Sequence, residues 1–162
     1  MQLSSPAFPP GGEIPIQYTQ DGVDESPPLL WSDIPPGTQS FALIVDDPDA
    51  PDPKAPSPQP WVHWVLVDLP PDIRSLPEGV MRLPGGRVGL NDWGNASWDG
   101  PLPPTGRHRY RFKLYAIDRM LGIERPTKAE LEAAMKDHVL DEAQLIGKYR
   151  RHPPAQAGHA GA

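Results

Sequence analysis

An alternating pattern of side chains behind a proline-rich loop constrains this chain more than any other feature. The loop spans residues 100–106 and reads GPLPPTG. Behind it the side chains alternate, and one parity consists of His108, Tyr110, Phe112, Leu114 and Ala116. Successive strand residues point to opposite faces, so this set is expected to form the core face of a β-strand. His108 and Tyr110 then lie at the rim of an apolar layer, where a ligand pocket can form.

A second candidate strand ends in carboxylates. Residues 41–47 read FALIVDD, and the strand must stop near Pro48 because proline cannot donate to a β-ladder. Asp47 has the parity of the apolar residues at 41, 43 and 45, so it ends an apolar row. Asp46 has the opposite parity and is expected to be structural. At least one of Asp46, Asp47 and Asp49 is expected to cap a turn through its side chain.

A third candidate strand carries the second histidine. Residues 61–67 read WVHWVLV, which is apolar on both faces, and His63 lies on the same face as Trp61. Two interpretations of His63 stay open: a ligand group, or a core histidine bonded to a backbone carbonyl, since buried polar groups need partners. Asp92 and Trp93, in a turn-forming segment, are expected to serve that turn and its packing.

The composition argues against several function classes. The 162 residues suffice for one domain with a sizeable core. The net charge is −6 and no basic stripe is visible, so neither nucleic-acid binding nor tight attachment to an anionic membrane surface is expected. Cysteine is absent, and no apolar run reaches 18 residues, so neither disulfides nor integral membrane association is expected. Because the first residues lack a signal-peptide pattern, we expect a cytoplasmic location.

The spacing of turn residues predicts the fold class. The 24 proline and 15 glycine residues are spread along the chain, which favours short strands separated by ordered loops from residue 13 to 118. We expect a mostly β protein, an antiparallel β-sandwich in one domain over residues 1–150. The polar residues 151–162 are expected to form a disordered tail.

Two short helices are predicted near the C-terminal end of the domain. The first begins after Pro126, where Thr127 and Glu130 form a capping box. The second is expected over about 140–147, because three apolar residues there fall at helical spacing, namely Leu140, Ala143 and Ile146.

Three motifs together resemble one protein family. DDPDAP at 46–51, WVHW at 61–64 and GPLPPTGRHRY at 100–110 resemble the phosphatidylethanolamine-binding protein (PEBP) family, in particular its bacterial, Raf-kinase-inhibitor-like branch. The resemblance covers roughly residues 10–150. Bacterial relatives often carry cysteine where this chain has Gln20 and Leu102, so a thiol role at these two positions is excluded.

The resemblance implies an antiparallel β-sandwich of Greek-key type with one small cavity that binds an anion such as phosphate. Relatives place the residues that match Asp47, His63, His108 and Tyr110 in that cavity. We expect the 100–106 loop to form its rim and Trp61 its wall. The full set of expected ligand-binding residues is Asp47, Asp49, Trp61, His63, Gly100, Pro101, Pro103, Pro104, His108 and Tyr110. The resemblance also favours a homodimer and a cis bond between Ala50 and Pro51.

Three functions remain open for these residues. The first is binding of a small anionic or phosphorylated ligand, in which two imidazoles, a phenol and backbone N–H groups act as donors. The second is a small-molecule enzyme that uses Asp47, His63 and His108 for acid–base chemistry. The third is a metal site built from these residues and Asp49. No nucleophile motif is evident, which favours binding over covalent catalysis, and we expect no cofactor and no resident metal.

Overall fold

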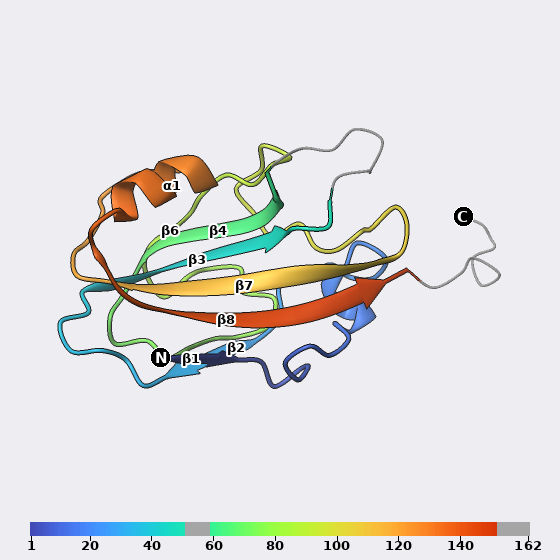
Figure 1. Ribbon diagram of the computed structural model, residues 1–162, viewed down its shortest axis with the longest axis horizontal. Helices are drawn as coiled ribbons and strands as arrows, with labels where there is room; N and C mark the ends of the chain where they lie inside the picture. Colours follow the sequence, from blue (N-terminus) through green and yellow to red (C-terminus); the bar gives the residue numbers. More distant parts are fainter. Residues whose placement is uncertain (51–58, 152–162) are drawn as a thin grey trace.

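The computed structural model describes residues 1–50 and 59–151 and contains two antiparallel sheets (Figure 1). The larger sheet has the order β6-β4-β3-β7-β8. Its strands are β3 (Ser40–Asp47), β4 (Trp61–Leu69), β6 (Arg87–Val88), β7 (Arg107–Ile117) and β8 (Val139–Arg150). The smaller sheet has the order β1-β2-β5, with β1 (Gln2–Ser4), β2 (Leu29–Ser32) and β5 (Ser75–Leu76). The expected mostly β, antiparallel fold is confirmed.

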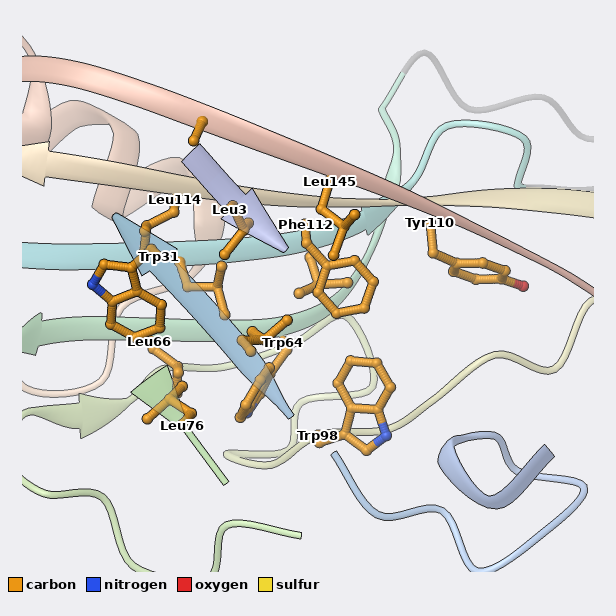
Figure 2. Packing of buried hydrophobic residues seen from close by; sticks show 14 of the residues in the cluster. Leu3, Trp31, Trp64, Leu66, Leu76, Trp98, Tyr110, Phe112, Leu114 and Leu145 are labelled. Carbon is orange, nitrogen blue, oxygen red and sulfur yellow. The ribbon is translucent and has the colours of Figure 1, made fainter. Parts of the chain in front are cut away.

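The main core lies between the two sheets. Alternate residues of the central strands point into it, as Phe112 and Leu114 of β7 do, and the smaller sheet contributes Leu3 and Trp31 (Figure 2). The alternation from residue 108 onward is therefore the core face of a strand, as the sequence predicts. His108 and Tyr110 lie on this face, at the end where β7 begins.

The helix α1 (Lys128–Met135) covers the other face of the larger sheet. Its N-cap is Thr127, whose hydroxyl accepts from the Glu130 amide while the Glu130 carboxylate accepts from the Thr127 amide, so the predicted capping box is confirmed. Leu131 and Met135 are buried against outward-facing residues of the sheet. The molecule thus has three layers: small sheet, large sheet and helix. A short 3-10 turn, η1 (Ile16–Tyr18), precedes β2.

The prediction of a second helix over about 140–147 is wrong, because these residues belong to β8. Beside the helical spacing the segment also has a two-residue alternation, and the residues of that alternation are buried: Ala143, Leu145, Gly147 and Tyr149. The strand pairs with β7 over its whole length, from Arg107↔Arg150 to Ile117↔Val139. Long-range pairing and burial therefore override the local helical spacing.

Two expectations lie outside the described residues. These are the cis bond between Ala50 and Pro51 and the order of the tail beyond residue 151. Among the described residues, no helix has the length and apolar character needed to cross a membrane.

Gly147 offers a test of the strand assignment. A Cβ atom at this position would lie 2.6 Å from Cγ1 of Ile14 and 2.8 Å from a ring carbon of Phe8. We therefore expect Gly147→Ala to lower the free energy of unfolding by about 1–3 kcal/mol through overpacking. In a helix the same change would stabilise by about 1 kcal/mol. Urea denaturation measures the sign, with the exposed Gln144→Ala as a control, and a stabilised Gly147→Ala would contradict the packing described.

Candidate functional site

A small cavity lies at the end of the large sheet where β3 ends and where β4 and β7 begin. The register pairs Asp47 with Trp61 there, and β7 enters beside them. The cavity has a volume of about 220 Å³. Its walls are formed by Asp47, Ala50, Trp61, His63, Trp93, Leu102, Pro103, Pro104, His108 and Tyr110. The structure therefore brings the four residues expected to converge, Asp47, His63, His108 and Tyr110, around one space.

Asp47 orients His108. Its Oδ1 accepts hydrogen bonds from the backbone amides of Asp49 (2.7 Å) and Ala50 (3.1 Å), which is the turn cap expected at this strand end. Its Oδ2 accepts from Nδ1 of His108 at 2.5 Å. Both side chains are buried. The Asp47 carboxylate, held by two backbone amides, accepts a hydrogen bond from the Nδ1–H group of His108. Nε2 is therefore the ring nitrogen of His108 that remains for a ligand.

His63 has the backbone partner expected of a core histidine, and its side chain also faces the cavity. It lines the cavity, and its Nδ1 lies 2.5 Å from the backbone oxygen of Asp99. A carbonyl oxygen only accepts, so Nδ1 carries the hydrogen. Burial lowers the pKa of His63, and the hydrogen bond to Asp99 and the nearby carboxylates oppose that effect only in part. His63 is therefore neutral at pH 7 and presents Nε2 as an acceptor, which corrects the expectation that both imidazoles act as donors.

The hydroxyl of Tyr110 has no hydrogen-bond partner among the described residues, although it is buried. The side chain is 1% exposed, and Figure 2 shows the hydroxyl directed away from Phe112 and the rest of the apolar cluster. The ring packs edge-on against His63, with 5.2 Å between the ring centroids. Burial raises the pKa of Tyr110 well above its ordinary value, so the hydroxyl keeps its proton and can donate it to a ligand.

Trp93 is a cavity residue that the sequence interpretation missed. Its ring packs edge-on against Trp61 and His63, at centroid distances of 5.4 and 5.0 Å. Asn91 holds the turn, because its Oδ1 accepts from the amides of Trp93 and Asn95, both at 3.0 Å. A turn residue has no strand parity, so no pattern indicates where its side chain points. Leu102 and Ala50, both on loops, were missed for the same reason.

Three residues of the expected set do not line the cavity: Asp49, Gly100 and Pro101. Asp49 accepts a bidentate pair of hydrogen bonds from the Arg109 guanidinium, which holds the pKa of Asp49 below its ordinary value. Gly100 donates its amide to Asp24, and the carbonyl of Pro101 accepts from the amide of Gln20. These residues hold the loop, whereas Pro103 and Pro104 form the rim as expected.

Asp46 has the structural role that its parity predicts. It is fully buried and forms ion pairs with Arg111 (2.7 Å), Lys113 (3.1 Å) and Lys128 (3.2 Å). Burial acts to raise the pKa of Asp46, but the hydrogen bond from Arg111 and the two lysines together hold it below its ordinary value. Among the described residues, no three histidine, aspartate or glutamate side chains are placed to hold a metal ion.

A larger groove of about 710 Å³ lies elsewhere, beside Trp64 and Trp98. Among the described residues, none of its buried side-chain polar atoms lacks a partner, and Trp98 donates to the Tyr18 carbonyl. The only buried side-chain polar atom without a partner among the described residues is the Tyr110 hydroxyl, in the smaller cavity. We therefore regard the smaller cavity as the candidate site.

The sequence of this chain also matches the model of a known protein family. A family model described as phosphatidylethanolamine-binding protein matches residues 4–150. The chain therefore belongs to the phosphatidylethanolamine-binding protein family, as its three motifs indicate. A UPF0098 protein from Methanothermobacter thermautotrophicus is 48% identical over 156 residues, which cover 93% of this chain and 99% of the relative. Relatives occur in archaea as well as bacteria, so the resemblance is not confined to a bacterial branch.

Two solved structures are similar over nearly the whole chain. A phosphatidylethanolamine-binding protein homologue from Chlamydia trachomatis is 40% identical with a TM-score of 0.88, and the match covers 93% of this chain and 97% of the other. YbcL from E. coli is 28% identical with a TM-score of 0.81, with coverage of 93% and 98%. Both support the fold described above.

His63 makes stability depend on pH. Its folded-state pKa lies below the ordinary value of 6.5, so the unfolded chain binds the proton more readily than the folded one. The contribution of His63 to stability is complete above about pH 6.5 and is lost as the pH falls, by at most about 1.4 kcal/mol per pH unit. Urea denaturation at pH 7.5 and 5.5 should show this loss, and His63→Gln should show a smaller one. Equal losses in the two proteins would contradict the buried neutral imidazole.

Proposed function

We propose that this protein binds a small phosphate-like oxyanion, carried by a small molecule, in the cavity between Asp47, His63, His108 and Tyr110. The observation that carries the proposal is the buried Tyr110 hydroxyl without a partner. Leaving such a donor unpaired costs about 1–3 kcal/mol, and a bound acceptor would remove that cost. Family membership supports a ligand-binding role for this fold.

The polar groups of the cavity suit a partly protonated oxyanion. In the proposed complex, Nε2 of His108 donates a charge-assisted bond to the anion while Nδ1 keeps its bond to Asp47, and the Tyr110 hydroxyl donates a second bond. His63 offers an acceptor, which fits a hydroxyl of the ligand such as the P–OH of a phosphomonoester monoanion. The proline rim and the Asn91 turn hold these groups in place before the ligand arrives, which lowers the ordering cost of binding.

His108→Ala tests the charge-assisted bond. Titration calorimetry with methyl phosphate at pH 6.5 should show a loss of about 1.5–3 kcal/mol in binding free energy relative to the unchanged protein. The matched control is His138→Ala, because His138 pairs with Asp118 at a half-exposed position outside the cavity. If His108→Ala binds methyl phosphate as tightly as the control does, His108 is not a ligand donor.

Tyr110→Phe separates binding from folding. The hydroxyl has no partner in the chain, so its removal should leave the free energy of unfolding unchanged or slightly higher. The same change should weaken methyl phosphate binding by about 0.5–1.5 kcal/mol, because one hydrogen bond to the ligand is lost. A large loss of stability together with unchanged affinity would mean that the hydroxyl serves the fold instead.

A further inference from the structure

Four basic side chains lie together on the outer face of the large sheet. The β7–β8 register pairs Arg107 with Arg150 and Arg109 with Lys148, and the intervening His108 and Tyr149 point to the core. We call these four residues the basic quartet. No basic stripe is visible in the sequence because strand alternation separates these residues from one another and the two strands are distant in the chain.

The quartet is unusual because like charges face each other across the strands. Directly opposed side chains in an antiparallel pair have Cβ atoms about 4.5–5.5 Å apart, and like charges there are destabilising. Among the described residues, Arg109 alone of the four has a carboxylate partner, Asp49. No ion pair joins the other three to any described carboxylate. With Asp49 the quartet carries a net charge of +3, on a chain whose net charge is −6.

The quartet is also open to a partner. Arg107 and Arg150 are exposed, and Lys148 is half-buried. Helix α1 lies over the opposite end of this sheet face (Figure 1). Glu13 lies next to Lys148 through a backbone bridge, but no ion pair forms between their side chains among the described contacts. Arg107, Lys148 and Arg150 therefore have no ion-pair partner among the described carboxylates, and only the Arg109 charge is balanced, by Asp49.

From this arrangement we propose that the basic quartet is a docking surface for an acidic, extended polypeptide segment of a partner protein. The face already binds carboxylates in this way: Arg109 holds Asp49 through a two-bond fork, and Arg111 holds Asp46. Alternate residues repeat every 6.6–6.8 Å along any extended chain, so alternating carboxylates of a peptide match the unpaired Lys148 and Arg150 in spacing.

Other polyanions fit this surface less well. Single-stranded nucleic acid is usually bound by basic grooves combined with aromatic side chains on which the bases stack. None of the residues that the register places on this end of the face is aromatic: Arg107, Arg109, Arg111, Lys148, Ile146 and Arg150. Membrane attachment by a basic face is strengthened by apolar groups that enter the bilayer, and here Ile146 is the single apolar member and is half-buried.

The test compares two double variants of equal charge change. Arg107→Gln/Arg150→Gln removes half of the quartet, and Arg82→Gln/Arg125→Gln removes two exposed arginines elsewhere. Fluorescence anisotropy at low ionic strength, with a labelled peptide of alternating glutamate and threonine, should show about tenfold weaker binding for the first variant and little change for the second. Thermal unfolding should show the first variant as stable as the unchanged protein or more so, since a like-charged pair is removed.

Two results would overturn the proposal. One is equal peptide affinity for the two double variants, which would reduce the quartet to part of the general surface charge. The other is that an oligo-thymidine strand or phosphatidylserine vesicles bind more tightly than the peptide and lose that binding in Arg107→Gln/Arg150→Gln. That result would assign the quartet to nucleic acid or to an anionic lipid surface. Binding of methyl phosphate in the cavity is measured separately, so this proposal can fail without the other.

Discussion

The antiparallel pairing of β7 with β3 on one side and β8 on the other is the constraint on which the rest of the molecule depends. It sets the face on which each β7 side chain lies, because strand neighbours alternate between faces. A shift of one residue would move His108 and Tyr110 to the outer face and Arg107 and Arg109 into the core. The cavity on one side and the basic quartet on the other are therefore two consequences of the same register.

Asp47 converts that register into a defined site. Its two oxygens are divided between the turn that ends β3 and the imidazole of His108. Both partners are buried, so the hydrogen bonds are little screened by water and the ring is held in one orientation. Asp46, one residue earlier, faces the opposite side of the sheet and is neutralised by three cations there. Of these two adjacent carboxylates, Asp47 therefore orients a cavity histidine on the core side of the sheet, and Asp46 forms ion pairs on the outer side.

The cavity combines satisfied and unsatisfied polar groups in a way that suggests a ligand. The backbone carbonyl of Asp99 accepts a hydrogen bond from Nδ1 of His63, and the Asp47 carboxylate accepts one from Nδ1 of His108. The Asn91 turn holds Trp93 in the cavity wall. Within this fixed frame the Tyr110 hydroxyl stays unpaired among the described residues. A ligand that accepts a hydrogen bond from this hydroxyl removes the free-energy cost of leaving it unpaired. Because the other groups of the cavity are already held in place, little ordering cost opposes that gain.

Much of the site could be predicted from local patterns. Alternation placed His108, Tyr110 and Asp47 on the core side, and proline marked where strand and loop meet, because both effects depend only on neighbouring residues. The family motifs extended this to the fold. Trp93 could not be predicted, since a turn residue has no periodic pattern that fixes its direction.

What only the tertiary structure decided is how distant strands lie against one another. Residues 140–147 have helical spacing as well as strand alternation, and pairing with β7 selected the strand. The same pairing brought Arg150 beside Arg107 and made a basic surface on an acidic chain. The sequence by itself determined which side chains share a face of each strand, because that follows from local geometry. Which strands lie side by side depends on burial and hydrogen bonding summed over the whole sheet, and only the folded chain settles it.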